Sequence, residues 1–231
     1  KADTLAKYPS SNISSVLQSV TFPVLSAIQN DEGRLSNTYR IFLRISAFVV
    51  FPLMVGLASV ADPMIRLILT NKWAGVITYL QIICFSMMWY PIHAINLNVL
   101  EVKGRSDYFL KLEIIKKVLG VVTLCVTIPM GLTAMCWGRV FTSVVCLPLN
   151  TYYTKKIIGY GFRHQMKDLM PILIHSLVMG VVAYGATLLA DGSGLKLLTG
   201  VCVGAIYYIA GAYIFKFSEM NEILEILKLK K

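Results

Sequence analysis

Two apolar stretches decide the fold of this chain: IFLRISAFVVFPLMVGLASVA at residues 41–61 and AGVITYLQIICFSMMWYPIHAINLNVL at residues 74–100. Each exceeds the roughly 20 residues that an α-helix needs to cross a hydrocarbon core about 30 Å thick. Arg44 is the only charged residue inside them, and it lies one turn from the start of the first stretch. The two stretches therefore predict membrane-spanning helices.

The composition of the whole chain agrees with this prediction. Charged residues make up 15% and hydrophobic residues 56% of the sequence, and mean hydropathy is +0.67, whereas a soluble domain carries about 25% charged residues. The apolar residues come in blocks of about 20, which excludes a single soluble core. The chain begins at Lys1 without a signal-peptide pattern, so we expect it to be the C-terminal part of a longer protein.

The same pattern predicts seven membrane helices, and thus an all-α fold, a polytopic membrane helix bundle. The helices are expected at about residues 11–29, 41–61, 74–100, 114–130, 132–153, 171–190 and 195–215. Pro52 and Pro91 should kink their helices, and Pro129 with Gly131 should form a tight turn. The first helix is the most polar, so it should face other helices or a hydrated cavity. Gly200, Gly204 and Gly211 predict close helix packing.

Basic residues give the chain a net charge of +10 and are unevenly distributed between its loops. When alternate loops are assigned to one side, sixteen of the 22 Lys and Arg residues gather there and five on the other, with Arg139 inside the fifth helix. Membrane proteins retain Lys and Arg on the cytoplasmic side, so the C-terminus is predicted to be cytoplasmic. Neither a basic helix nor an aromatic platform indicates nucleic-acid binding.

The last segment, residues 216–231, is too charged to span a membrane. Met220, Ile223, Leu224 and Leu227 share one helical face, and Glu219, Glu222, Glu225 and Lys228 share the other. This pattern predicts an amphipathic helix on the cytoplasmic leaflet, with a solvated tail as the alternative.

The sequence contains little that indicates catalysis. GxSxG, HExxH and P-loop motifs are absent, and the acidic residues fall in loops or at helix ends. The five cysteines have no metal-ligand spacing, so no metal or cofactor is expected. A channel would need a repeated filter or a ring of charge, and the sequence shows neither. A helix bundle with embedded polar residues is instead typical of a transporter rather than an enzyme.

Several polar residues inside the predicted helices are candidates for a transport site. Arg139 lies about two turns into the fifth helix, where it either reaches the outer interface or lines a hydrated cavity that attracts an anion. His93, Asn96 and Asn98 could line the cavity or form interhelical hydrogen bonds. Lys116 and Lys117 could contact substrate or anchor the helix to lipid headgroups.

Three stretches resemble a known family: SSVLQSVTFPVLS at residues 14–26, the pairs Arg34-Leu35 and Tyr39-Arg40, and ADPMIRLILTNKW at residues 61–73. They resemble the bacterial polysaccharide and O-antigen flippases, the Wzx- or WzxC-type lipopolysaccharide biosynthesis proteins of the MOP exporter superfamily. The resemblance covers essentially the whole chain and is most specific between Ser11 and Lys117.

The resemblance implies a transporter with two six-helix lobes around a central cavity, followed in many members by two further helices. This chain would supply the C-terminal lobe of such a MATE-like fold. Residues 1–154 would form five helices of the second lobe, residues 155–215 the two additional helices, and residues 216–231 the cytoplasmic tail.

The implied function is alternating-access export of polyprenyl-pyrophosphate-linked oligosaccharide across the cell inner membrane, for lipopolysaccharide, O-antigen, capsule or exopolysaccharide biosynthesis. Implied partners are this lipid-linked substrate, membrane lipids, the missing N-terminal lobe and polysaccharide polymerase machinery. The substrate-cavity candidates are Arg139, Gln18, Asn12, His93, Asn96 and Asn98. The expected cytoplasmic basic rim is Lys103, Arg105, Lys111, Lys116 and Lys117.

Three alternatives remain open. The first is a drug or cation antiporter of the same superfamily, because these stretches indicate common ancestry more than they indicate the ligand. A polyprenol-dependent membrane glycan polymerase or ligase often carries a large periplasmic loop, whereas the predicted outer loops here are short. A purely structural membrane subunit would not need the embedded polar residues.

Overall fold

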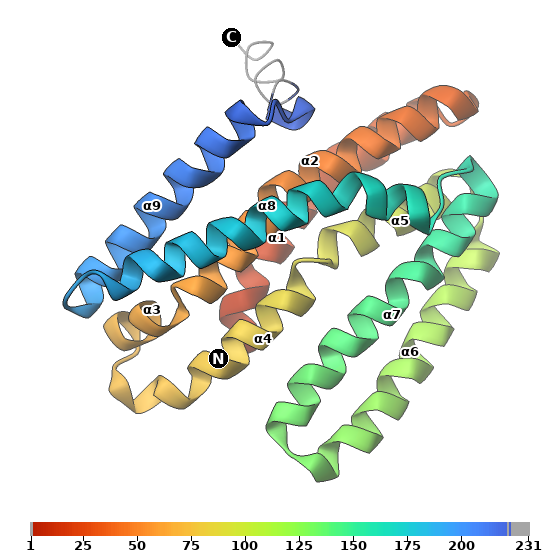
Figure 1. Ribbon diagram of the computed structural model, residues 1–231. Coiled ribbons are helices and arrows are strands. Elements are labelled where there is room, and N and C mark those ends of the chain that lie inside the picture. The colour runs from red at the N-terminus through yellow and green to blue at the C-terminus, as the bar shows by residue number, and fades with distance from the viewer. Residues whose placement is uncertain (1, 221, 223–231) are drawn as a thin grey trace.

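Long helices run back and forth through one bundle in the computed structural model, which describes residues 2–220 and residue 222 (Figure 1). The α-helices are α1 (Ala2–Ala27), α2 (Glu32–Ser59), α3 (Ala61–Ile68), α4 (Ile77–Met87), α5 (Tyr90–Val102), α6 (Ser106–Thr127), α7 (Leu132–Ile158), α8 (Phe162–Leu188) and α9 (Ser193–Ile214). Short 3-10 helices at Asn71–Val76 (η1) and Ile128–Met130 (η2) precede α4 and α7.

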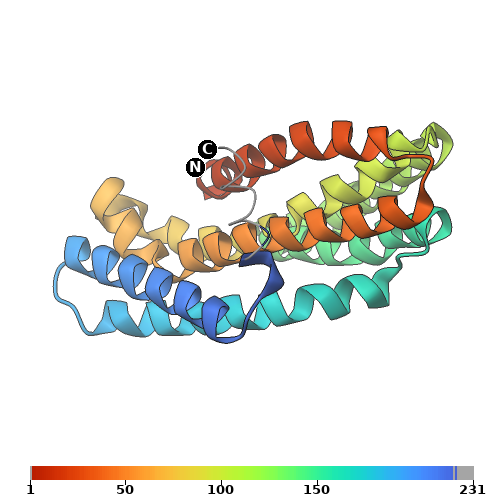
Figure 2. The same ribbon diagram turned by 90° about the horizontal axis from the view of Figure 1, so that it is seen from above.

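Helix α2 is the centre of the bundle. Leu43, Ala47, Phe51 and Met54 recur at intervals of three to four residues and are almost fully buried, so they form one apolar stripe. Figure 2 shows α1 on one face of α2, and α8 with α9 on the other. Helices α4 and α5 also pack on α2, and the α6–α7 hairpin lies beside them (Figure 1).

Five segments are long and apolar enough to cross a membrane: Glu32–Ser59, Asn71–Val102, Leu132–Ile158, Phe162–Leu188 and Ser193–Ile214. Each overlaps a predicted span, so the all-helical membrane bundle is confirmed for these five. Helices α1 and α6 lie where the first and fourth spans were predicted, but they are not among the five. They are more polar, and α6 carries Lys111, Glu113, Lys116 and Lys117 within its length.

The third predicted span is divided into α4 and α5 just before Pro91. Proline has no backbone N–H, so the carbonyl four residues earlier, that of Met87, loses its helical donor. Ser10 of α1 donates its hydroxyl to this carbonyl at 2.7 Å. The kink predicted at Pro91 is in the structure a break between two helices, and the freed carbonyl ties α1 to the bundle.

Pro52 creates the same deficit inside α2, which continues through it unbroken. Its missing N–H frees the carbonyl of Phe48. Tyr208 of α9 donates its hydroxyl to this carbonyl at 2.8 Å, and the two aromatic rings lie 5.2 Å apart. A hydroxyl from a neighbouring helix thus satisfies an acceptor that lipid could not satisfy.

The contact between α8 and α9 depends on glycine, which confirms the close packing predicted there. A Cβ atom on Gly200 would lie 2.7 Å from Thr187 Cγ2, and one on Gly211 would overlap the His175 ring at Cε1. Gly204 is buried in the same contact. Any larger residue at these positions would force the helices or their side chains apart.

Two arginines of α2 pair with distant carboxylates. Arg40 donates to Asp168 of α8 at 2.5 and 2.6 Å. Arg44, the one charge in the first apolar stretch, donates to Glu219 at 2.6 Å and to Ser218 at 2.9 Å. Glu219 is 1% exposed, and the guanidinium of Arg44 compensates its buried charge. The rest of the predicted amphipathic helix, residue 221 and residues 223–231, lies outside the residues that the structure describes.

We expect Tyr208→Phe to destabilise the protein by about 1–2 kcal/mol, because it leaves the Phe48 carbonyl without a donor. Thermal and denaturant unfolding of the full-length protein in detergent would measure this. In a Pro52→Ala background the restored N–H can reach Phe48, so Tyr208→Phe should cost less there. Equal costs in both backgrounds would contradict the assignment. Tyr213→Phe, on the exposed side of α9, is the matched control.

Gly211→Ala should destabilise by about 1–3 kcal/mol, because the added methyl group overlaps His175. Gly185→Ala is the matched change in α8 at a position where a Cβ meets nothing within 4 Å. It should be neutral or stabilising by up to about 1 kcal/mol, since alanine is the better helix former. The same unfolding measurements apply, and similar losses for both variants would refute the close-contact explanation.

Candidate substrate cavity

An open cavity of about 690 Å³ lies along α5, α6 and α7, with one residue each of α1 and α4 in its wall. It is lined by Gln18, Ser86, Tyr90, His93, Ala94, Leu97, Asn98, Glu101, Phe109, Glu113, Lys116, Lys117, Arg139, Thr142, Ser143 and Cys146. The α6–α7 hairpin that forms one side turns through η2 and Gly131, whose φ of +94° suits glycine. This is the tight turn predicted from Pro129 and Gly131.

Three cations lie on the side of the cavity that α6 and α7 build. Lys116 is 16% exposed and pairs with Glu113 at 3.2 Å, one turn earlier on the same helix. Lys117 is exposed and makes no ion pair within the described part of the chain. Arg139 pairs with Asp3 in the first turn of α1. These charges give the cavity a region that can attract an anion.

Neutral hydrogen-bonding groups line the α5 side. Asn150 donates to His93 Nδ1 at 2.8 Å, which leaves His93 Nε2 to donate to the Ser143 hydroxyl at 3.2 Å. Asn98 is buried, and its Nδ2 has no hydrogen-bond partner among residues 2–220 and 222. Apart from the carboxylate of Glu101, this wall therefore offers uncharged hydrogen-bonding groups.

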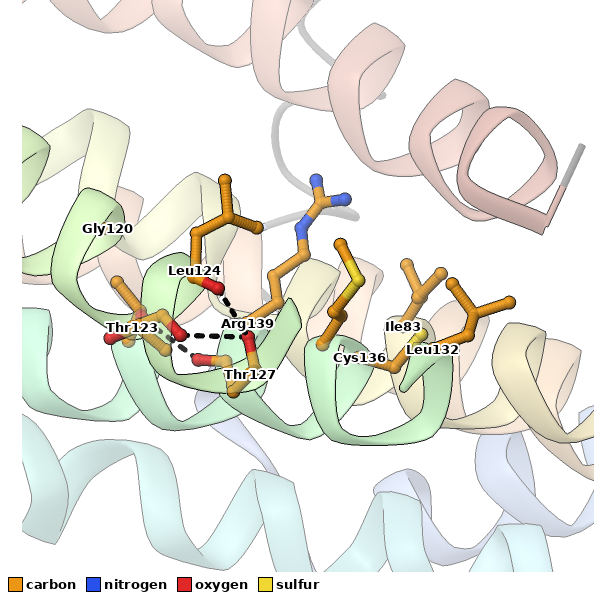
Figure 3. Close-up of a pocket in the computed structure, with 11 residues that line it drawn as sticks. Ile83, Gly120, Thr123, Leu124, Thr127, Leu132, Cys136 and Arg139 are labelled. Atoms are coloured by element: carbon orange, nitrogen blue, oxygen red, sulfur yellow. Dashed lines mark hydrogen bonds between the residues drawn. The ribbon is translucent and has the colours of Figure 1, made fainter. Parts of the chain in front are cut away.

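A smaller hollow of about 380 Å³ adjoins the cavity and shares Arg139 and Thr142 with it (Figure 3). A Cβ atom on Gly138 would lie 2.9 Å from Thr123 Cγ2, which shows that α6 and α7 approach closely here. In Figure 3 the Arg139 side chain extends away from Thr127 and toward α1. Its guanidinium is thus directed out of the hairpin.

Asn96 lies elsewhere, in a buried polar cluster that joins four helices. Tyr39 and Thr154 each donate to Asn96 Oδ1 at 2.9 Å. Gln165 donates to the same oxygen at 3.0 Å and to the Tyr39 hydroxyl at 2.9 Å. The structure places Asn96 in interhelical packing, the alternative that the sequence left open, and not among the cavity-lining residues.

The remaining candidates lie away from the cavity. Asn12 is exposed on α1. Lys103 and Arg105 stand in the turn between α5 and α6, where Arg105 pairs with Asp107 at 3.1 Å. Lys111 is exposed on α6. Of the five residues expected in a basic rim, only Lys116 and Lys117 line the cavity.

Sequence reasoning missed the carboxylates of the site. Glu113 could have been found from its i,i+3 spacing to Lys116, and Glu101 from its position one turn beyond Asn98 on α5. The contact between Asp3 and Arg139 spans 136 residues and has no local signal.

The chemistry of the cavity is that of binding. In the described ranges, no group of three or more His, Cys, Asp or Glu side chains could hold a metal ion. Three cations on one side and mostly neutral hydrogen-bonding groups on the other suit a ligand with an anionic part and a polar part.

Comparison with known proteins shows that the chain is similar to polysaccharide biosynthesis proteins. A family described as "Polysaccharide biosynthesis protein" matches residues 1–78. The chain is 22% identical over 206 residues to the teichuronic acid biosynthesis protein TuaB of Bacillus subtilis (strain 168), covering 87% of this chain and 43% of TuaB. It is 23% identical over 193 residues to the lipopolysaccharide biosynthesis protein WzxC of Escherichia coli (strain K12), covering 80% and 39%.

The fold is also similar to a solved transporter. The lipid II flippase MurJ, in an inward closed conformation, superposes with a TM-score of 0.77 and 18% identity, covering 93% of this chain and 45% of MurJ. At that identity the likeness establishes the fold alone. The chain spans less than half the length of the curated relatives that it matches. The chain is therefore similar to polysaccharide biosynthesis proteins and has part of the MurJ fold.

Proposed function

We propose that this chain is one lobe of a flippase that moves polyprenyl-pyrophosphate-linked oligosaccharides from the cytoplasmic to the periplasmic leaflet of the inner membrane. The product would enter lipopolysaccharide, O-antigen, capsule or exopolysaccharide synthesis. The observation that carries this proposal is a cavity with three cations, Lys116, Lys117 and Arg139, inside a membrane bundle of the MurJ fold.

The chemistry of such a substrate explains why a cavity of this kind is needed. Sugars and a pyrophosphate cannot enter hydrocarbon without losing their hydration, so a hydrated protein surface must replace it. Lys116, Lys117 and Arg139 would hold the pyrophosphate. Gln18, His93 and Asn98 would face the sugars, while the lipid tail stays in the bilayer. No covalent bond is made or broken, so the protein would not be an enzyme.

The proposed topology follows from the distribution of charge. We place α1 and α6 across the membrane together with the five apolar segments, because their polar faces border the cavity and the bundle. The basic loops and the C-terminus would then be cytoplasmic. Residues 1–154 would belong to the second lobe, residues 155–215 would be two additional helices, and residues 216–231 would lie on the inner leaflet.

A first lobe would complete the cavity. The chain covers less than half of its relatives, and its cavity is open. Rocking of two lobes would expose the site to each side of the membrane in turn. Membrane lipids and a polysaccharide polymerase would be further partners.

Deletion of the full-length gene should abolish the surface polysaccharide and leave lipid-linked repeat units in the cytoplasmic leaflet. Immunoblotting of surface glycan and extraction of polyprenyl-linked intermediates would measure both effects, and a plasmid copy should restore the glycan. Normal surface glycan in a deletion strain without a second flippase would refute the proposal, and drug sensitivity without glycan loss would indicate an antiporter.

Arg139→Ala should reduce export by roughly tenfold or more, because a guanidinium can hold a phosphate through two charged hydrogen bonds. Lys117→Ala should have a smaller effect, since an ammonium offers a point charge without fixed geometry. Lys111→Ala, on α6 but outside the cavity lining, is the control and should export normally. Surface glycan normalised to protein abundance is the measurement, and equal small effects would remove Arg139 from the site.

A further inference from the structure

We propose that Asp3 is a resident counter-ion of Arg139, which the anionic group of the substrate displaces on binding. The inference rests on the proposed function, because it takes Arg139 as a contact for the pyrophosphate. Asp3 would then be a positioning residue: it holds the guanidinium in place while the cavity is empty and links α1 to α7 until substrate arrives.

The geometry that supports this exchange is an ion pair between two helices. Asp3 lies in the first turn of α1, and Arg139 lies two turns into α7. Helix α1 packs mainly on α5, α2 and α4, and α7 mainly on α6, α4 and α5. The carboxylate of Asp3 and the guanidinium of Arg139 therefore connect two helices that have other main neighbours. Figure 3 shows the Arg139 side chain directed toward α1.

The other carboxylate–cation pair in the cavity differs from this one. Glu113 pairs with Lys116 three residues later on the same helix. An anion that replaced Glu113 would leave both residues on α6 and would change no contact between helices. Replacement of Asp3 would instead break a contact between α1 and α7. Only the second exchange can convert the arrival of an anion into movement of a helix.

The exposure of the pair makes the exchange favourable. The side chains of Arg139 and Asp3 are 41% and 52% exposed. An ion pair this accessible raises the equilibrium constant for forming the contact by a factor of about five at most. A charged hydrogen bond to phosphate raises the binding constant by a factor of roughly ten to a hundred. A pyrophosphate carries more charge and more acceptor oxygens than one carboxylate. It should therefore win the competition for Arg139.

Displacement would couple occupancy of the site to the position of α1. That helix also carries Gln18 in the cavity wall and Ser10, which donates to the Met87 carbonyl beside the α4–α5 break. A ligand that binds better when the Asp3–Arg139 contact is open shifts the population toward that open state.

The test is a double-mutant cycle on the purified full-length protein with farnesyl pyrophosphate as the probe. Calorimetry or fluorescence would give Kd for the wild type, Asp3→Asn, Arg139→Gln and the double variant. Asp3→Asn should bind the probe about two- to fivefold more tightly, because the competing carboxylate is gone. Arg139→Gln should bind at least tenfold more weakly. In the Arg139→Gln background, Asp3→Asn should have no effect, since there is no guanidinium to release.

The gain in affinity separates this role from a structural one, because a variant that merely damaged the fold would bind less well. Asp62→Asn is the matched control: Asp62 pairs with Arg66 at 2.9 Å on α3, and neither residue lines the cavity. Its Kd should equal that of the wild type. Unchanged or weaker binding by Asp3→Asn, with normal loss in Arg139→Gln, would overturn the counter-ion role and leave the proposed function standing. Probe binding that does not depend on Arg139 would overturn both.

Discussion

The constraint on which this structure depends is that a backbone carbonyl in lipid must receive a hydrogen bond from protein. Pro52 and Pro91 each remove one helical N–H, and each leaves a carbonyl without its donor. The hydroxyls of Tyr208 and Ser10 supply the missing hydrogen bonds. One comes from α9 and the other from α1, so both outer layers of the bundle are fastened to its centre at the points where proline weakens a helix.

Ion pairs divide the charged residues of the bundle into fixed and exchangeable groups. Arg44 pairs with Glu219, which is 1% exposed, so the carboxylate cannot leave without exposing an uncompensated buried charge. Asp3 pairs with Arg139 while 52% exposed, and solvent or an incoming anion can replace it at little cost. The same kind of contact therefore stabilises the bundle where it is buried and, on the proposed mechanism, would give way to a ligand where Arg139 borders the cavity.

Helical periodicity determines which residues of α5 can line the cavity. The sequence predicts Gln18, His93, Asn98 and Arg139 in the cavity and Lys116 and Lys117 in a basic rim, and the structure brings all six to one cavity. Asn96 and Asn98 cannot share that wall, because residues two positions apart in the sequence point about 200° apart on a helix. Helical spacing could thus have assigned Asn96 to the core. Its partners Tyr39, Thr154 and Gln165 come from three other helices, and no local pattern names them.

The sequence by itself determined the positions of the long helices, the interruption near Pro91, the hairpin turn at Gly131 and the glycine contact between α8 and α9. These features follow from hydropathy, from the missing proline N–H and from the small size of glycine, which are properties of one or a few neighbouring residues. Only the tertiary structure decided that Asp3 meets Arg139, that Glu219 meets Arg44 and that one cavity gathers residues of five helices. Such contacts depend on how helices pack in space, and residues more than a hundred positions apart carry no local record of one another.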